Sequence, residues 1–266
     1  MRLVTIASWN VNSIRARIHN ITTWIKANNP DILCLQETKT EDKTFPFDAI
    51  ESLGYHAEIH GQKSYNGVAI LSKHQPEEVI KGLPGDDLDE QARFIEATFV
   101  INSQILRIGN LYLPNGNPIA TAKYHYKITW IERFLDFASQ RLELEEPVIF
   151  AGDYNIIPQP CDCYDPEAWK DDACFTLEVR HAFQKLQNIG FTDAIRAISD
   201  APHLYSFWNY RPGSWKKNKG LRIDHLMLSP EAIPLFKSAQ IDQIPRGCEK
   251  PSDHAPVILY LEVPEN

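Results

Sequence analysis

Cysteine is scarce in this 266-residue chain, which has five, an odd number without paired spacing. Such a count argues against a framework of disulfide bonds and favours a reducing compartment, so we expect a cytoplasmic protein. Cys161, Cys163 and Cys174 fall close enough together to suggest a zinc site. No fourth ligand stands at a standard spacing, and unpaired thiols are the favoured interpretation.

Long apolar runs are absent as well. No stretch reaches the roughly 20 apolar residues that a membrane helix requires. Residues 1–6 have the pattern of a strand and not that of a signal peptide. We therefore expect no membrane association and no signal peptide. The chain also contains no repeat, low-complexity tract or linker, which predicts one domain over residues 1–266.

Positive charge is in deficit. The 27 Lys and Arg residues are outnumbered by 35 Asp and Glu, which gives a net charge of −8. This balance argues against a protein that binds polyanions through its overall charge. It leaves room for local basic patches and for carboxylates gathered around a metal.

Apolar periodicity indicates strands and helices mixed along the whole chain. Strand-like runs cover residues 3–9, 32–35, 67–71, 93–100, 105–113, 147–150, 221–228 and 257–263. Helical spacing marks residues 14–25, 124–138 and 178–188. The pair 93–100 and 105–113 predicts a hairpin, so the expected α/β fold contains a mixed sheet.

The stretch 151–155, Ala-Gly-Asp-Tyr-Asn, follows a short run of buried-strand character. Gly152 is expected to end that strand. Asp153 and Asn155 lie two apart, so in extended backbone they would point to the same side. An Asx turn that merely closes the strand is the alternative interpretation.

Similar polar groups stand at the ends of other predicted strands. These candidates are Asn10, Asn12, Glu37, Tyr112, Asp224, Asp253 and His254. Each could be an ordinary exposed or turn residue, but the repeated placement on six segments favours a shared site. Carboxylate and amide oxygens suit a hard cation such as Mg²⁺, and a histidine backed by a carboxylate is held in one tautomer. Together they predict metal-assisted phosphodiester hydrolysis.

Six motifs in their order and spacing resemble one family: the exonuclease III-like apurinic/apyrimidinic endonucleases of the endonuclease/exonuclease/phosphatase superfamily. The motifs are residues 7–12, 30–39, 112–116, 152–155, 220–224 and 251–256. The resemblance covers nearly the whole chain and implies a four-layered α/β sandwich, with two mixed sheets face to face and helices outside. Asn12 departs from the pattern because some members carry Asp there.

The resemblance also implies roles for single residues. The implied metal set is Glu37 as principal ligand, then Asn10, Asp153, Asn155, Asp253 and His254. The implied catalytic set is Tyr112, Asp153, Asn155, Asp224 and His254. In these roles Asp153 positions or deprotonates the attacking water, and His254, oriented by Asp224, hydrogen-bonds the phosphate. Mg²⁺ is the expected cofactor, with Mn²⁺ as the alternative.

Two further segments favour DNA as the substrate. Phe207, Trp208 and Leu221 resemble an apolar pocket that accepts an extruded abasic sugar, although core packing is the alternative. The basic residues Arg211, Lys216, Lys217, Lys219 and Arg222 could meet phosphates, although a solvated loop is the alternative.

The sequence thus predicts a Mg²⁺-dependent DNA repair nuclease that cuts 5′ to abasic sites and carries 3′→5′ exonuclease or 3′-phosphodiesterase activity. Its expected partner is double-stranded DNA with abasic sites or blocked 3′ ends, and it is expected to act as a monomer. The alternatives are a superfamily phosphoesterase acting on RNA or a small phosphorylated molecule, and a catalytically inactive DNA-binding protein.

Overall fold

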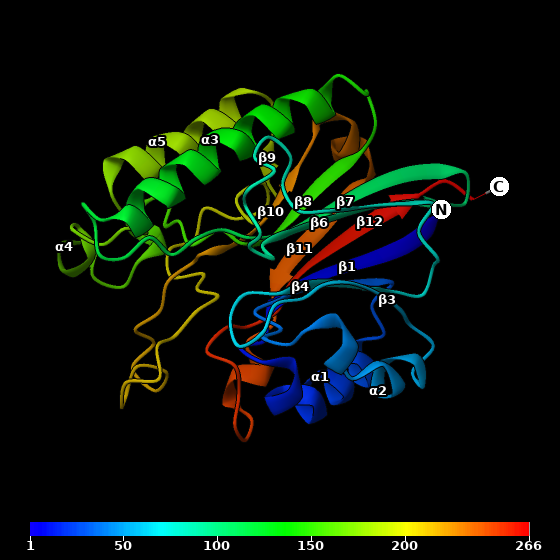
Figure 1. Cartoon of the computed structure of the whole chain (residues 1–266), viewed down its shortest axis with the longest axis horizontal. Coiled ribbons are helices and arrows are strands. Elements are labelled where there is room, and N and C mark those ends of the chain that lie inside the picture. The colour runs from blue at the N-terminus through cyan, green and yellow to red at the C-terminus, as the bar shows by residue number, and fades with distance from the viewer. Residues whose placement is uncertain (266) are drawn as a thin grey trace.

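Two six-stranded sheets stacked face to face form the centre of the molecule, and helices cover both outer faces (Figure 1). This computed structural model describes residues 1–265. The predicted four-layered α/β sandwich is therefore confirmed.

The first sheet has the order β11-β12-β1-β2-β4-β3 and the second β5-β6-β7-β8-β10-β9. The first contains β1 (Arg2–Asn10), β2 (Ile32–Gln36), β3 (His56–His60), β4 (Val68–Ser72), β11 (Phe236–Ile241) and β12 (Val257–Val263). The second contains β5 (Glu78–Lys81), β6 (Phe94–Ile101), β7 (Gln104–Tyr112), β8 (Val148–Asp153), β9 (Thr192–Asp193) and β10 (Asp224–Leu228). Each sheet is mixed, because β1 and β2 pair in parallel, as do β7 and β8, while the other pairs are antiparallel.

The helices lie on opposite sides of the sandwich. α1 (Ile14–Asn28) and α2 (Phe47–Glu51) cover the first sheet, whereas α3 (Ala122–Leu142) and α5 (Leu177–Asn188) cover the second (Figure 1). A short α4 (Pro166–Trp169) and four 3₁₀ turns lie in the connections; the turns span Asp42–Thr44, Pro160–Asp162, Pro230–Leu235 and Ile244–Gly247. Among residues 1–265, no helix has the length and hydropathy to span a membrane.

Three apolar layers hold these elements together. Ile6, Ile108 and Leu259 belong to the layer between the sheets, which explains why the central strands are continuous apolar runs. Phe134 and Phe150 join α3 to the second sheet, and Trp24 joins α1 to the first. Because the sheets are buried on both faces, polar groups gather at the strand ends.

The helix predictions and the hairpin prediction are confirmed. Ser13 caps α1 by accepting the N–H of Ala16, and β6 and β7 form the hairpin. The four edge strands, β3, β5, β9 and β11, were not predicted, because they lack long apolar runs. The predicted strand 221–228 is too long: it begins at Asp224, and Leu221 instead forms isolated bridges to Cys163 and Phe207.

Two expectations about the central stretch are wrong. Gly152 lies inside β8, where a Cβ atom would come within 2.0 Å of the carbonyl oxygen of Leu111 on β7. Asn155 is not extended but left-handed, with φ 47°. Its N–H donates to Oδ1 of Asp153 at 2.9 Å, so the Asx turn and the strand-end polar pair exist together.

Candidate active site

The strand ends converge at one edge of the sandwich because of the way the strands pair. Asn10 ends β1, Tyr112 ends β7 and Asp153 ends β8. β10 runs antiparallel to β8, so its first residue, Asp224, pairs with Asp153. β12 is antiparallel to β1, and His254 stands three residues before it. The predicted juxtaposition of these side chains is therefore present.

Asn10 joins the two sheets through a pair of carboxylates. Its Nδ2 donates to Oε1 of Glu37 and to Oδ2 of Asp153, both at 2.9 Å. Its Oδ1 accepts the backbone N–H of Asn12 at 3.0 Å. The structure thus gives Asn10 a bridging role between the two sheets, and its implied role as a metal ligand stays a prediction.

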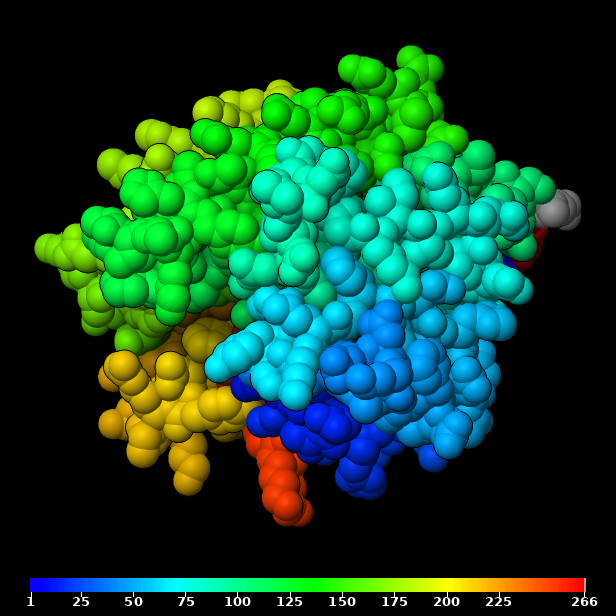
Figure 2. Space-filling model, in the orientation of Figure 1, coloured from blue at the N-terminus to red at the C-terminus, as the bar shows by residue number. Residues whose placement is uncertain are grey.

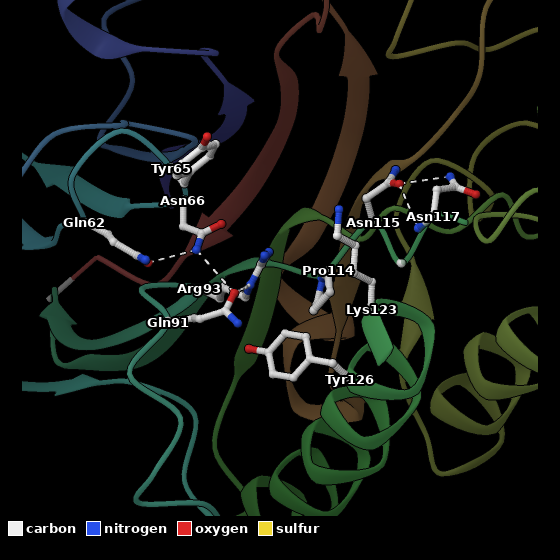
Figure 3. A pocket seen from close by; sticks show the side chains of 11 residues that line it. Gln62, Tyr65, Asn66, Gln91, Arg93, Pro114, Asn115, Asn117, Lys123 and Tyr126 are labelled. Atoms are coloured by element: carbon white, nitrogen blue, oxygen red, sulfur yellow. Dashed lines mark hydrogen bonds between the residues drawn. The ribbon is translucent and has the colours of Figure 1, made fainter. Parts of the chain in front are cut away.

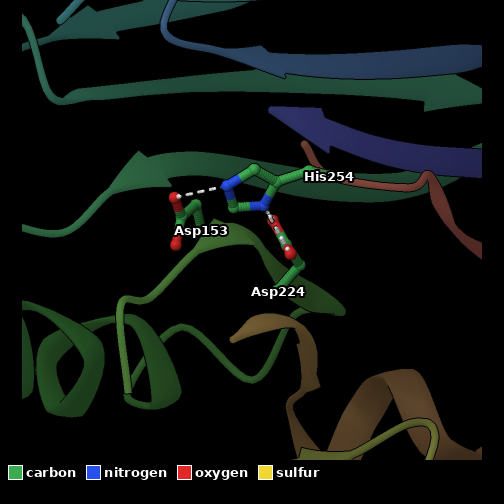
Figure 4. Close-up of side chains that lie close together, drawn as sticks. All are labelled: Asp153, Asp224 and His254. Carbon is green, nitrogen blue, oxygen red and sulfur yellow. Dashed lines mark hydrogen bonds and ion pairs between the residues drawn. The ribbon is translucent and has the colours of Figure 1, made fainter. Parts of the chain in front are cut away.

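His254 lies between two buried aspartates (Figure 4). Its Nδ1 is 2.8 Å from Oδ2 of Asp224, and its Nε2 is 3.7 Å from Oδ2 of Asp153. The hydroxyl of Ser206 also donates to Asp224, at 2.6 Å. Burial opposes the charged imidazolium, but the carboxylates of Asp224 and Asp153 outweigh it and raise the pKa of His254 to about 10. The ring is therefore a cation aimed at the Asp153 carboxylate.

Asp153 and Tyr112 have pKa values displaced by the same surroundings. Burial raises the pKa of Asp153 above its ordinary value, while the charge of His254 opposes this shift. Burial, followed by the charges of Glu37 and Asp153, raises the pKa of Tyr112 well above its ordinary value. The Tyr112 hydroxyl is thus neutral and lies within the influence of the Glu37 carboxylate. Perturbed groups gathered in this way are typical of a reactive site.

The donor set around Glu37 fits a divalent cation. Its carboxylate already holds a positive group, because Nζ of Lys39 lies 2.7 Å from its Oε2. Burial opposes ionisation of Glu37, but Lys39 and Asn10 outweigh it and lower its pKa. Asn12 links this part of the site to Asp253, accepting from Lys39 at 2.6 Å and donating to Asp253 at 3.1 Å. Charged oxygens close to a partly exposed edge are the ligands that hard cations select.

A second cluster of ligand-type atoms is less suited to a metal. Those of Asp153, Asp224 and His254 lie within 4.8 Å of one another. Both ring nitrogens of His254 already face carboxylates, however. We interpret this cluster as a hydrogen-bonding and proton-handling group.

Backbone strain also marks this edge. The non-glycine residues Asn12, Glu37, Lys39 and Asn155 all have left-handed φ angles, between 45° and 52°. Residues of this kind are uncommon outside glycine and concentrate at functional sites. Lys39 was not predicted as a site residue, although its place two residues after Glu37 was a usable signal.

The predicted sugar pocket is present only in part. The ring of Phe207 lies 4.9 Å from that of His254, and Phe207 and Leu221 line an adjoining cavity of about 240 Å³. Trp208 does not line it: it is 0% exposed, and its Nε1 donates to Oδ1 of Asn218 at 2.9 Å. Trp169, which was not predicted, takes part in the lining instead.

The predicted basic residues also divide into two groups. Arg222 is fully buried and pairs with Asp162 at 2.7 Å and with Asp193 at 2.6 Å, so it is not available to phosphates and that prediction is wrong. The others are exposed: Arg211, Lys216, Lys217 and Lys219. Their segment and the one near residue 250 project from the same lower edge of the molecule (Figure 2).

A groove that was not predicted adjoins the site through Asn115. Its volume is about 450 Å³, and Arg93 and Lys123 contribute cationic groups to its lining (Figure 3). The guanidinium of Arg93 also lies 4.9 Å over the ring of Tyr112. Polar amides such as Asn66 complete its wall. Arg93 is the first residue of the predicted strand 93–100 and directly precedes β6 in the structure; nothing in the sequence distinguishes it from a surface residue.

A two-sheet sandwich defines a phosphoesterase of the nuclease class when its strand ends present carboxylates that could hold a cation, a paired Asp and His, and adjoining cavities with cationic and aromatic side chains. Comparison of this chain with known proteins leads to the same class. The sequence pattern of the endonuclease/exonuclease/phosphatase family matches residues 7–254, and the chain belongs to this family. It is a hydrolytic enzyme, a DNA repair nuclease.

Three proteins that are similar to this chain show which kinds of nuclease it resembles. Exodeoxyribonuclease III of Haemophilus influenzae is 35% identical over 261 residues, covering 94% of this chain and 97% of the relative. An AP endonuclease from Archaeoglobus fulgidus is 37% identical, with a TM-score of 0.92 over 98% of this chain and 100% of that one. The Neisseria 3′ phosphatase NExo, solved with a product DNA hairpin, is 36% identical, with a TM-score of 0.91 and the same coverage.

Proposed function

We propose that the protein is a Mg²⁺-dependent nuclease that cuts double-stranded DNA 5′ to abasic sites and trims blocked 3′ ends. The observation that carries the proposal is the Asn10 amide, which joins Glu37 of one sheet to Asp153 of the other at 2.9 Å each. It sets a cation-binding carboxylate beside a base that faces a histidine cation.

Each residue of the site has a separate role in hydrolysis. Asp153, whose raised pKa makes it a better proton acceptor than an ordinary aspartate, takes the proton of the attacking water. His254, kept charged by Asp224, hydrogen-bonds a phosphate oxygen, and the neutral hydroxyl of Tyr112 reaches the phosphate or the leaving oxygen. Glu37, with Asp253 near by, would hold the Mg²⁺ ion, which would supply charge stabilisation for the phosphate.

The surroundings support DNA as the substrate. The cavity beside His254 has an apolar part, formed by Phe207, Leu221 and Trp169, that could receive an extruded sugar without a base, and its other walls carry polar and basic groups. Arg93 and Lys123 in the adjoining groove offer charges for the flanking phosphates. AP endonuclease and 3′ phosphatase are the named activities of two structural relatives, and both are reactions of one phosphoester centre.

One assay tests the proposal. The protein is incubated with Mg²⁺ and either a duplex carrying a single abasic analogue or a duplex ending in a 3′-phosphate. A single nick 5′ to the analogue and release of phosphate are expected, and Asp153→Ala should abolish both. Cleavage of the 3′-phosphate alone would remove abasic incision from the proposal, and cleavage only of RNA or small phosphoesters would replace it.

Two further parts of the proposal concern the state of the protein. All five cysteines are free thiols in the structure, which supports the expected cytoplasmic setting. We propose a monomer, because the strand ends of a single chain bring the candidate site residues together. Light scattering checks this: the free protein should give the mass of one 30.5 kDa chain, and its DNA complex the mass of one chain plus one duplex.

A further inference from the structure

The side chain of Lys127 on α3 is fully buried beneath the active site. Its Nζ donates to the carbonyl oxygens of Asn155, at 2.6 Å, and Asn115, at 3.1 Å. Within residues 1–265 no carboxylate lies in ion-pair distance of it. Burying an ammonium group whose partners are main-chain oxygens lowers the stability of the fold, so its presence points to a functional role.

The two carbonyls belong to the loops that follow β7 and β8. These loops are also joined directly, since Nδ2 of Asn115 donates to Oδ1 of Asn155 at 3.0 Å. Nδ2 of Asn155 in turn donates to the carbonyl of Leu113 at 2.9 Å. Lys127 thus lies below a pair of strand-end loops and closes their hydrogen-bond network from the inside.

Asn155 connects this network to the proposed base. Its carbonyl accepts from Lys127, and its N–H donates to Oδ1 of Asp153 at 2.9 Å. Its backbone is left-handed, with φ 47°, a conformation that asparagine adopts more readily than most residues and that the hydrogen bonds on both sides of it hold in place here. The lysine supplies one of those constraints.

A glycine leaves room for the lysine stem. Gly116 follows Asn115 and has φ 84°, and a Cβ there would lie 2.6 Å from Cδ of Lys127 and 3.1 Å from its Cβ. The loop after β7 therefore passes over the lysine stem at a distance that only glycine allows. This contact is independent of the hydrogen bonds at the other end of the side chain.

We propose that Lys127 is a positioning residue for phosphodiester hydrolysis: its ammonium ties the loop after β7 to the loop after β8 and so holds Asn155 and Asp153 in their reactive arrangement. The role rests on the proposed function of Asp153 as the base. Lys127 touches neither substrate nor metal in this role, and it acts through the main chain of Asn155.

Lys127→Met removes the charge and the donors but keeps the length of the side chain, whereas Lys127→Gln keeps two donors without the charge. Lys185→Met, on the exposed face of α5, is the matched control. For Lys127→Met we expect kcat on both DNA substrates to fall at least about tenfold with KM changed less than about threefold, because DNA binding does not involve this residue. The Gln variant should retain more activity than the Met variant, and the control should match the parent.

Amide hydrogen exchange gives a readout independent of turnover. In Lys127→Met, exchange at the N–H of Asn155 should accelerate at least about tenfold, while the amides of β12 keep their protection. A folded variant with unchanged kcat and unchanged exchange at Asn155 would overturn the proposal. If the Met variant does not fold, the same two measurements on Lys127→Gln decide the question.

The exchange experiment separates this inference from the proposed function. If the parent does not cut abasic DNA but Lys127 variants lose protection at Asn155 and trim 3′ ends more slowly, the substrate is wrong and the positioning role stands. If the parent cuts abasic DNA and the variants are unimpaired, the positioning role fails alone.

Discussion

Asn12 shows how one residue changes the electrostatics of the site. A carboxylate at this position would compete with Glu37 for a cation, but Asn12 accepts from Lys39 and donates to Asp253. Asn12 therefore lies between Lys39 and Asp253 and hydrogen-bonds both without adding a charge to the site. Glu37 is left as the acidic group that pairs most directly with a cation here, since Lys39 lies 2.7 Å from it.

Glu37→Ala should weaken Mg²⁺ binding without removing the base. At low Mg²⁺ we expect the rate to fall, and the Mg²⁺ concentration for half-maximal rate to rise at least about tenfold, which corresponds to roughly 1.4 kcal/mol of lost binding free energy. Raising Mg²⁺ should restore part of the rate. Calorimetric titration and Mg²⁺-dependent rates measure this, with the exposed Glu51→Ala as control. Normal activity at low Mg²⁺ would disprove the assignment of Glu37.

Neighbouring residues at the start of β10 have different roles: one belongs to the active site, and the others belong to a buried ion cluster. Asp224 faces the active site, while its neighbours Arg222 and His225 are buried in an ion cluster with Asp162 and Asp193. Nη1 of Arg222 is 3.0 Å from Nδ1 of His225, and Nε2 of His225 is 3.0 Å from the carbonyl of Ile156. His225 is therefore neutral, donating to the carbonyl and accepting from the guanidinium.

His225 should make the fold sensitive to acid. Burial and then the charge of Arg222 lower its pKa from 6.5 to about 4. The contribution of His225 to stability is complete above pH 6.5. It is lost between pH 6.5 and 4, at up to about 1.4 kcal/mol per pH unit, because the unfolded chain takes up the proton first. The stability difference between parent and His225→Gln should shrink over this range.

Urea unfolding at pH 7.5, 6 and 5 measures that difference. The exposed His56→Gln is the matched control, because it removes a histidine outside the cluster. A difference that stays constant across these pH values would show that His225 is not held neutral by its neighbours.

Adjacent residues in the segment after Tyr205 have opposite environments. Phe207 is half-buried beside the cavity, whereas Trp208 packs against Tyr205 and Trp215. Trp208→Ala should lower the free energy of unfolding by about 3–5 kcal/mol and reduce all activities together. Phe207→Ala should reduce abasic incision more than 3′-end trimming, since trimming requires less extrusion. Thermal melts and the ratio of the two rates check both; an unchanged ratio for Phe207→Ala would exclude the cavity from sugar binding.

The charge of the whole molecule opposes DNA, so binding must depend on where the charges lie. The net charge is −8, but Arg93 and Lys123 line one cavity and Arg211 and Lys219 another. Both cavities adjoin the same strand-end site. A local basic track of this kind binds phosphates while the remaining acidic surface limits binding elsewhere.

Lys216, Lys217 and Lys219 should contribute affinity without sequence preference. Replacing all three by Ala should weaken binding to any duplex and lower the slope of log affinity against log salt by about 0.9 per lost phosphate contact. Turnover at saturating DNA should change little. A salt titration with Ca²⁺ in place of Mg²⁺ measures this, with Lys26, Lys185 and Lys237, exposed on other faces, replaced as control. An unchanged slope would show that the loop is only solvated.

Much of this fold could be predicted, because apolar periodicity is local and strong in α1, α3 and the central strands. The edge strands β3, β5 and β11 escaped prediction because each is half-exposed, so its pattern carries little apolar signal. The length of β10 was overestimated because Leu221 and Ile223 are apolar but lie before the strand. They pack instead in a separate cluster with Cys163.

The strand-end motifs were sufficient to predict which segments meet, since parallel and antiparallel pairing places the polar ends of such strands at one edge. The roles of single side chains depended on packing, which sequence spacing does not encode. Trp208 and Arg222 lie next to Phe207 and Leu221 in the chain, yet their side chains turn into the interior and find Asn218 and two aspartates there. Lys127 is likewise buried, because the loops after β7 and β8 lie over it. Long-range contacts decide such cases, because burial and hydrogen-bond partners are properties of neighbours in space.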